Sequence, residues 1–421
     1  MDKELLRQII IDHKESYLFN PLIEREKELE ANLNYCFVGL RRSGKSYMMF
    51  QLINQLLSEG VPMSSILYLN FEDERLVGIT KDDLNTVLEL GLAFAGEGNK
   101  PHFFLDEIQN VDGWEKFARR LADTKYHVCI TGSNSKMLSG EIASTLGGRF
   151  LVEEVYPYSF SEYLCALGRK APEGTLSTKE SAAMMSVYSD YAKYGAFPEL
   201  VTIKNKIDYL RSVYQTIYLG DIVAHNHVEN PFAMRLILKK LGESVGRPLS
   251  FTRITNIVKS AGLAIGKQTV INYLGYAVDS YLVFVIQNYM GKLVDKETSP
   301  KYYFGDSGLL NLLSLDCESA QLENLVAIEL LRRYGNGNVF YFSDKAEVDF
   351  YLPEEKLTIQ VCLRVLNDLE TKERELGAFA KLKNFIPDVN CLLLTNAEEE
   401  TVDYQGIEVR VLPVWKFLLG K

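Results

Sequence analysis

The chain has 421 residues, of which 47% are hydrophobic, 11% aromatic and 24% charged, and its formal net charge is −10. This composition excludes a disordered or collagen-like protein. The acidic balance excludes a surface covered uniformly with phosphate-binding charge, although a local basic face remains compatible with it. At roughly 100–200 residues per domain, the length predicts two to four domains, each with its own core.

The sequence also bears on the compartment of the protein. No segment approaches the ~20 consecutive apolar residues that a membrane-spanning helix needs. The N-terminal stretch MDKELLRQIIIDHKE lacks the apolar centre of a signal peptide. The six cysteines lie far apart, without a CxxC pair. We therefore expect reduced cysteines, a cytoplasmic location and no membrane partner.

Short apolar runs alternate with amphipathic stretches in the first part of the chain. The runs typical of strands are 34–39, 65–71, 102–107, 127–132 and 150–155. Each gap between them is long enough for a crossover helix, and continuous apolar runs are typical of buried parallel strands. We therefore expect an α/β fold whose parallel sheet has helices on both faces. From about 156 to 230 the pattern is helical.

A glycine-rich segment follows the first of these strands. Its sequence, GLRRSGKS, matches the GxxxxGK[ST] pattern of a phosphate-binding loop, and an apolar helix begins at its last residue. Lys45 is expected to reach the β- and γ-phosphates of a nucleotide, and the Ser46 hydroxyl is expected to bind Mg²⁺. The alternative is a simple turn between strand and helix. The expected nucleotide-binding residues are Gly39, Arg41, Arg42, Ser43, Gly44, Lys45 and Ser46.

Two carboxylates end the third apolar run. Asp106 is the expected second Mg²⁺ ligand, and Glu107 is the expected general base that activates water against the γ-phosphate. Apolar strands often end in acidic residues, so the pattern gains its meaning from the phosphate-binding loop before it. Because a passive binding site has no use for a base, Glu107 favours hydrolysis over binding alone.

Polar residues follow the fourth run. Ser133 and Asn134 could hydrogen-bond the γ-phosphate or the attacking water, or simply form a polar turn. Arg149, after two glycines, could stabilise the charge on the transferred phosphoryl group, or be an ordinary surface charge.

Several segments together resemble a known family. In chain order they are GLRRSGKS, FFLDEIQNVDGWE, ITGSNSKML, GGRF and YPYSFSEYL. They resemble the AAA-type ATPases of archaea and bacteria that carry a C-terminal domain of unknown function. The segment YGAFPE (194–199) matches that family's GGFPE segment, with Ala196 in place of the second glycine.

This resemblance extends from about residue 18 to residue 421. It implies a P-loop core with strand order 5-1-4-3-2 and ATP, rather than GTP, as the nucleotide. It also implies a sensor role for Ser133 and Asn134 and an arginine-finger role for Arg149, either in its own site or in that of a neighbouring chain. A homo-oligomer is therefore among the expected states.

Residues 231–270 carry a local excess of positive charge. Seven Lys or Arg residues face one acidic residue, Glu243, which gives +6 in a chain of net charge −10. The pattern there is helix, glycine-containing turn, second helix and apolar strand, as in a winged helix-turn-helix module. The second helix, from about 267 to 277, is expected to expose Lys267, Gln268, Asn272 and Tyr273. Residues 231–278 are thus the expected contact for duplex DNA, and a packing or protein-contact module is the alternative.

The last part of the chain resembles the PD-(D/E)XK nuclease fold. Glu323 on a helix and Asp349 on a strand match two acidic positions of that fold, but its Glu-x-Lys position reads Gln360-Val361-Cys362. Gln lacks the charge that a hard cation needs, Cys cannot replace an ammonium group, and Arg364 would compensate only in part. We therefore expect a folded domain without nuclease activity, retained for a protein partner.

The expected fold is a P-loop NTPase core (1–160), a helical lid (161–230), a winged-helix module (231–295) and an α/β nuclease-like domain (296–421). The expected function is ATP hydrolysis with Mg²⁺ that drives or gates a conformational change in the appended DNA- or protein-binding domains. The alternatives are a nucleotide-gated switch with little turnover and an ATP-dependent nuclease. The Gln360 and Cys362 pair argues against the nuclease.

Overall fold

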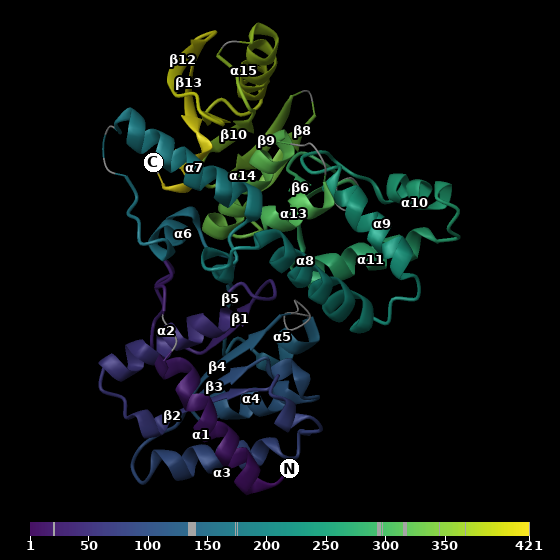
Figure 1. The fold of residues 1–421 in the computed structure, drawn as a ribbon. Helices are drawn as coiled ribbons and strands as arrows, with labels where there is room; N and C mark the ends of the chain where they lie inside the picture. Colours follow the sequence, from purple (N-terminus) through teal and green to yellow (C-terminus); the bar gives the residue numbers. More distant parts are fainter. Residues whose placement is uncertain are drawn as a thin grey trace. The chain divides into compact units, whose positions relative to one another are not determined.

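The computed structural model describes residues 1–420 except 20–21, 134–139, 173, 175, 293–295, 297, 315–317, 345 and 367. The chain forms two compact units, Met1–Tyr156 (unit 1) and Pro157–Lys421 (unit 2), which Figure 1 colours from purple to blue and from blue-green to yellow. Each unit is described by itself. No helix among the described residues is long and apolar enough to cross a membrane.

Unit 1 is built on one parallel sheet. Its strands are β1 (Tyr35–Val38), β2 (Ile66–Asn70), β3 (His102–Asp106), β4 (His127–Gly132) and β5 (Leu151–Glu154). They lie in the order β2-β3-β4-β1-β5, and every neighbouring pair is parallel. The expected α/β fold and strand order 5-1-4-3-2 are confirmed. All the carboxyl ends of the strands therefore meet at one edge of the sheet.

Helices connect and cover these strands. They are α1 (Lys3–Phe19), α2 (Lys45–Ser58), α3 (Leu84–Ala95), α4 (Trp114–Asp123) and α5 (Gly140–Leu146). Helix α1 packs along the edge strand β2. The backbone N–H of Asn70 donates to His13 Nδ1 at 3.2 Å, and His13 Nε2 lies 2.9 Å from Asp73 Oδ2. The helix thus satisfies part of an edge that would otherwise be open to pairing.

Unit 2 begins with helices. They are α6 (Phe160–Ala166), α7 (Thr178–Tyr194), α8 (Lys206–Thr216) and the π-helix η6 (Ile217–Ala224). Ser159 and Ser177 begin α6 and α7 with complete capping boxes. Helix α7 packs against α13 (Ser307–Leu313) and α14 (Glu318–Tyr334). The segment expected to be a lid is therefore part of the compact unit that contains the C-terminal sheet.

The YGAFPE segment is fixed by one buried carboxylate, that of Asp306, which caps the start of α13. Ala196 N–H donates to Asp306 Oδ2 at 2.8 Å, while Gly308 N–H donates to Asp306 Oδ1 at 2.8 Å. Gly195 has φ +78°, and a Cβ there would lie 2.1 Å from Asp306 Oδ1. Glycine is therefore required at position 195 for both backbone and steric reasons.

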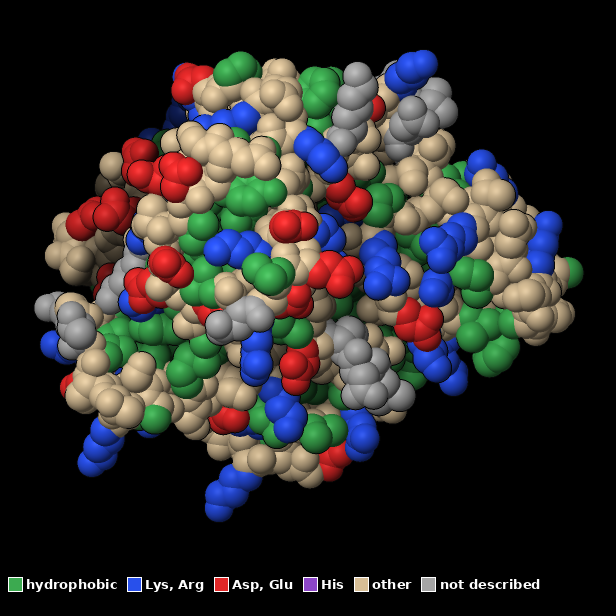
Figure 2. Space-filling view, turned by 90° about the horizontal axis from the view of Figure 1, so that it is seen from above, with side chains coloured by type: hydrophobic (Ala, Val, Ile, Leu, Met, Phe, Trp, Pro, Cys, Tyr) green, Lys and Arg blue, Asp and Glu red, His purple; other side chains and the backbone are tan. Residues whose placement is uncertain are grey.

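Three helices follow that contact one another: α9 (Pro231–Gly242), α10 (Phe251–Ser260) and α11 (Lys267–Asp279). Lys and Arg side chains gather over this part of unit 2, at the right of Figure 2. Lys267, Gln268 and Asn272 are exposed as expected. The expectation for Tyr273 is wrong, because its ring is only 4% exposed and its hydroxyl accepts from Asn230 N–H at 3.1 Å.

A mixed eight-stranded sheet completes unit 2, in the order β12-β13-β11-β10-β9-β8-β6-β7. Its strands are β6 (Val283–Asn288), β7 (Lys301–Phe304), β8 (Phe340–Ser343), β9 (Glu347–Leu352), β10 (Leu357–Val361), β11 (Asn390–Thr395), β12 (Glu400–Tyr404) and β13 (Ile407–Pro413), with helices α15 (Leu369–Lys383) and α16 (Val414–Leu418). Strand β6 pairs with both β7 and β8. The sheet therefore crosses the boundary that we expected at residue 295.

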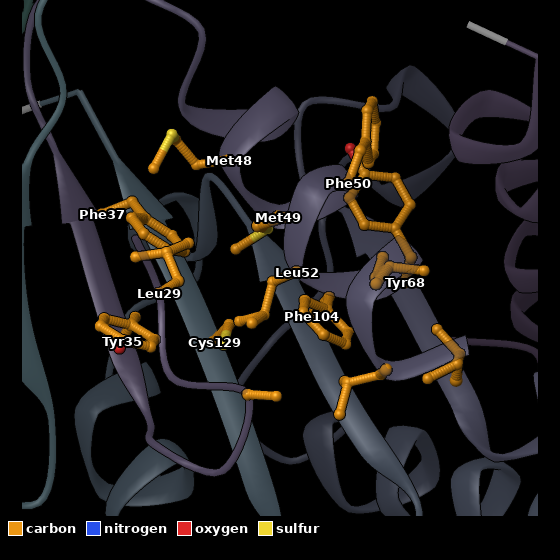
Figure 3. Packing of buried hydrophobic residues seen from close by; sticks show 14 of the residues in the cluster. Leu29, Tyr35, Phe37, Met48, Met49, Phe50, Leu52, Tyr68, Phe104 and Cys129 are labelled. Atoms are coloured by element: carbon orange, nitrogen blue, oxygen red, sulfur yellow. The ribbon is translucent and has the colours of Figure 1, made fainter. Parts of the chain in front are cut away.

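The core of unit 1 shows how the sequence places the phosphate-binding loop. Met48, Met49 and Leu52 of α2 point toward Phe37 of β1 and Phe104 of β3, as Figure 3 shows, and all five are at most 2% exposed. Burying side chains of this size is worth roughly 1.5–3 kcal/mol each. This packing holds the N-terminus of α2 at the carboxyl edge of the sheet.

Candidate functional site

The backbone of the loop between β1 and α2 needs glycine at two positions. Gly39 has φ +141°, and a Cβ there would lie 2.4 Å from the Val155 carbonyl oxygen. Gly44 has φ +100° and stands immediately before the first residue of α2. The loop therefore turns back tightly and directs the N–H groups of the helix start into its own concave side.

A buried arginine that sequence reasoning missed supports this loop. The Arg25 guanidinium is 8% exposed and donates to the Ser43 carbonyl at 3.2 Å and to the Tyr156 carbonyl at 2.7 Å. It thus joins the loop to the end of β5. Arg25 lies in the run EREKELE, whose charged pattern gives no sign that one of its members is buried.

Lys45 is folded back onto the loop. Its side chain is 4% exposed, and its Nζ donates to the carbonyls of Gly39 at 3.2 Å and Leu40 at 3.3 Å. The same Nζ lies 3.6 Å from Glu107 Oε1. The ammonium group is thus held beside the expected base by weak contacts that a phosphate can replace.

Asp106 ends β3 as a buried carboxylate with a full set of donors. It is 1% exposed; Tyr68 donates to its Oδ2 at 2.6 Å, and Thr131 donates to its Oδ1. Burial and the neighbouring Glu107 raise the pKa of Asp106, while hydrogen bonds from Ser46, Thr131 and Tyr68 lower it in part. The two expected Mg²⁺ ligands, Ser46 and Asp106, therefore lie together.

Glu107 has an unusual backbone. Its φ of +51° lies in the left-handed region, which is costly for a residue with a side chain, and its N–H donates to Thr131 Oγ1 at 2.8 Å. Burial alone would raise the pKa of Glu107. The attraction of Lys45 and a hydrogen bond from Gln109 outweigh burial, with smaller help from Arg41 and Ser133, so the pKa is lowered. Glu107 is therefore ionised at neutral pH.

Tyr68 and Thr131 were absent from the expected site residues. Both are polar residues inside mainly apolar strands, ILYLN and HVCITG. A buried polar side chain almost always has a hydrogen-bond partner. A polar residue within a mainly apolar strand was therefore the sequence feature that pointed to both Tyr68 and Thr131.

The remaining expected site residues differ in exposure and in the groups that they contact. Ser133 is 5% exposed and its hydroxyl hydrogen-bonds Glu107. Arg41 pairs with Glu72 at 2.9 Å. Arg42 is exposed, with φ +64°. Asn134 lies outside the described residues.

Arg149 does not reach the loop of its own chain. It precedes β5, beside Asn34 at the amino end of β1, where its Nε pairs with Asp123 and its carbonyl accepts from Asn34 Nδ2 at 3.2 Å. The phosphate-binding loop lies at the other end of β1. This placement separates Arg149 from its own loop, and its roles in its own site and in that of a neighbouring chain both stay predictions.

The residues present fit a nucleotide with Mg²⁺. The Ser43 hydroxyl is buried and has no hydrogen-bond partner among the described residues. The loop offers N–H groups at a helix start, where phosphate binds readily. Among the described residues no group of three or more His, Cys, Asp or Glu side chains could hold a metal alone. Ser46 and Asp106 supply one or two protein oxygens, which is how Mg²⁺ is usually held beside water and substrate phosphates.

The nuclease-like positions in unit 2 hold a cation of the chain itself. Lys301 of β7 is fully buried, and its Nζ lies 3.4 Å from Glu323 Oε1 and 3.2 Å from Asp349 Oδ1. Tyr303 also donates to Glu323 Oε1 at 2.7 Å. Burial and the nearby Asp349 raise the pKa of Glu323 to about 7. The space between the two carboxylates is thus taken by an ammonium group that sequence reasoning did not foresee.

Gln360 completes this arrangement. Its Oε1 accepts from Asp349 N–H at 2.8 Å, and its Nε2 donates to Glu375 Oε2 at 2.8 Å. A carboxylate at position 360 could not donate to Glu375. The glutamine that replaces the expected acid is therefore built into a hydrogen-bond chain.

Sheet order and loop together define the class: this is a P-loop ATPase fold of the AAA type. The family model described as "AAA domain" matches residues 32–164, and the model described as "Domain of unknown function (DUF8612)" matches residues 185–320.

The chain belongs to the same family as two relatives that it matches over nearly their whole length. It is 34% identical over 435 residues to an uncharacterised protein of Methanocaldococcus jannaschii, covering 100% of this chain and 96% of the relative. It is 30% identical over 414 residues to an uncharacterised protein of Haemophilus influenzae, covering 94% and 98%. Among solved structures, the Walker-type ATPase of Pyrococcus abyssi is 13% identical with a TM-score of 0.39, covering 71% of this chain and 99% of that one. At that similarity nothing about function follows.

Proposed function

We propose that this protein binds ATP with Mg²⁺ in unit 1 and hydrolyses it. The observation that carries the proposal is the meeting of a lysine, a serine and two carboxylates at one edge of the sheet, with Lys45 Nζ 3.6 Å from Glu107 Oε1. Ser46 and Asp106 are joined in the same network.

Each side chain has a distinct role in this proposal. Mg²⁺, when bound through Ser46 and Asp106, would neutralise charge on the phosphates. Lys45 exchanges its two carbonyl acceptors for phosphate oxygens. Glu107, ionised and fixed by its backbone bond to Thr131, accepts the proton of the attacking water. Ser133 orients the Glu107 carboxylate.

Steady-state ATP turnover and the affinity for a fluorescent ATP analogue test these roles. Lys45→Ala is expected to abolish binding. Glu107→Gln is expected to retain binding but lower turnover by roughly 10²–10⁴-fold, the usual contribution of a general base. Glu97→Gln is the matched control, because Glu97 is an exposed glutamate of the same unit. Normal turnover in Glu107→Gln would refute the assignment of the base.

Tight ATP retention without product release in the unsubstituted protein would instead favour the alternative, a nucleotide-gated switch. In either case we propose that nucleotide state alters the appended unit 2. Comparing proteolysis of unit 2 with and without ATP would test this coupling, and an unchanged cleavage pattern would oppose it.

A second proposal concerns duplex DNA at residues 231–278, arranged as a winged helix. It is supported by the exposed Lys259, Lys267 and Gln268 on α10 and α11. We expect the double variant Lys259→Glu/Lys267→Glu to weaken duplex binding and to lower the slope of log K against log salt by about 2, near one per lost phosphate contact. If the protein does not bind duplex DNA and duplex DNA does not change its ATP turnover, α9–α11 is a packing module.

We further propose that the C-terminal domain has no nuclease activity, because Lys301 already occupies the space between Glu323 and Asp349. Supercoiled plasmid is expected to remain intact with Mg²⁺ or Mn²⁺. Cleavage that requires Asp349 would show instead that this site is an active nuclease.

A further inference from the structure

Unit 2 contains a pocket that the proposed ATPase activity does not use. A pocket of about 620 Å³ lies between the end of α7, α8, the π-helix η6, α9 and α13, and we name it the tyrosine groove. Its lining includes Tyr194, Tyr214, Tyr218, Leu219, Arg235 and Asn311.

The walls of the tyrosine groove are mainly apolar and aromatic. The rings of Tyr214 and Tyr218 are parallel within 12°, with centroids 5.9 Å apart. Ile207 and Leu219, which also line it, are 42% and 55% exposed. Apolar side chains of this size gathered around a hollow are typical of a binding surface.

The charged residues that line the groove are all basic. Lys193, Arg211 and Arg235 line it, and no acidic residue is found among its described lining residues. Arg211 has an exposed partner in Asp208 at 3.2 Å, whereas Arg235 lies over the Tyr218 ring at 5.9 Å from the centroid. In a chain of net charge −10, this local excess favours an acidic ligand.

Two buried polar atoms in the lining lack partners. The Tyr214 hydroxyl and Asn311 Oδ1 are buried and make no hydrogen bond among the described residues. Asn311 Nδ2 already donates to the Lys193 carbonyl at 2.6 Å, which fixes Oδ1 as the atom left to accept. A buried polar group without a partner costs roughly 1–3 kcal/mol. A ligand that supplies both a donor and an acceptor would remove that cost.

The π-helix provides an independent observation. Helix α8 continues into η6 without a break, since Ile217 remains helical with φ −62° and ψ −49°. π-Helical turns are rare and occur frequently at functional sites. Here the π-helix carries Tyr218 and Leu219 to the groove.

We propose that the tyrosine groove binds an acidic peptide segment of a partner protein. Apolar side chains of the peptide insert against Tyr214 and Leu219, and flanking Asp or Glu side chains face Arg235 and Lys193. Rotation of the Asn311 and Tyr214 side chains toward the groove would let a peptide backbone supply the N–H for Asn311 Oδ1 and the carbonyl for the Tyr214 hydroxyl. Single-stranded nucleic acid also stacks on tyrosines, but its sugar–phosphate backbone lacks such regular donors and does not use the leucine and isoleucine walls.

The test is selection of peptides from a phage-displayed library of random 12-residue sequences on the full-length protein. The selected peptides are expected to combine aromatic or aliphatic residues with Asp or Glu. Synthetic copies, measured by fluorescence anisotropy, are expected to bind at least tenfold more weakly to Arg235→Glu and to Leu219→Glu. Arg253→Glu, an exposed charge reversal on α10 outside the groove, is the matched control and is expected to bind normally.

Three outcomes would overturn the proposal. The first is a failure to select any peptide above background. The second is selected peptides that are basic or neutral, or that bind the two groove variants as well as the unsubstituted protein. The third is a 20-residue oligo(dT) whose binding is lost in Arg235→Glu and Leu219→Glu while no peptide binds, which would assign the groove to nucleic acid. ATP turnover in the groove variants separates this result from any failure of the proposed ATPase.

Discussion

Replacing Lys301 with methionine tests whether one ammonium group holds the two acidic side chains of unit 2 together. Methionine keeps the length of the stem but removes the charge that lies within 3.4 Å of both Glu323 and Asp349. Removing one partner of a buried ion pair costs about 3–5 kcal/mol, because the other charge is left uncompensated. We therefore expect Lys301→Met to lower the free energy of unfolding of unit 2 by about this amount at pH 8.

The loss should depend on pH. Since burial already raises the pKa of Glu323 to about 7, removal of Lys301 raises it further, and the folded variant binds a proton that the unfolded chain releases. Stability then falls as the pH rises, by at most about 1.4 kcal/mol per pH unit. At pH 6 the variant should therefore recover part of what it has lost at pH 8.

The assay can isolate unit 2 because the chain has two tryptophans, Trp114 in unit 1 and Trp415 in unit 2. In a Trp114→Phe background, urea unfolding followed by fluorescence reports unit 2 through Trp415 alone. The matched double variant Lys301→Met/Glu323→Gln removes the ammonium group and one of its two carboxylate partners, and leaves Asp349 as the single charge. It should regain stability relative to Lys301→Met, and the reasoning fails if it is no more stable.

Three further predictions follow from side chains around the two sites. Tyr68→Phe removes a donor to Asp106, so the Mg²⁺ concentration for half-maximal ATP turnover should rise roughly tenfold, as for other residues that orient metal ligands; an unchanged Mg²⁺ curve would contradict this. Burial and the neighbouring His102 lower the pKa of His127 to about 4. Unit 1 should therefore lose up to about 3 kcal/mol as the pH falls from about 6.5 to 4. In Trp415→Phe proteins, Trp114 fluorescence in urea should show a weaker pH dependence for His127→Gln, and equal curves would refute the argument. Gly195→Ala should lower the melting temperature of unit 2, since strain at this backbone costs of order 1–3 kcal/mol; an unshifted transition would show that the segment adapts.

The parallel sheet and the phosphate-binding loop could be predicted from the sequence because both follow from local sequence patterns. Continuous apolar runs predicted the strands of unit 1, and the terminal residues of those strands necessarily meet at one edge. Lys45, Ser46, Asp106 and Glu107 could be placed together for that reason alone.

The residues that hold this site in position were not accessible in the same way. Tyr68, Thr131 and Arg25 act through contacts with groups 18 to 131 positions away in the chain. Local pattern carries no record of such contacts. Arg149 precedes the parallel strand β5 and so lies at the amino edge of the sheet, and its expected role stays a prediction.

Lys301 shows a third limit. The nuclease pattern covers only Glu323, Asp349 and residues 360–362. Lys301 lies on β7, outside that pattern. A missing carboxylate was visible in the sequence, whereas the cation that takes the metal's place was not.

The pairing of β6 with both β7 and β8 affects how this protein can be cut and recombined. A fragment ending near residue 295 would keep β6 and lose its neighbours on both sides, leaving two open edges for aggregation. Helix α11 also packs against β6, and α9 packs against β7, so excising α9–α11 would expose surfaces that the C-terminal sheet now covers. Natural recombination and protein engineering would both have to exchange α9–α11 together with the C-terminal sheet.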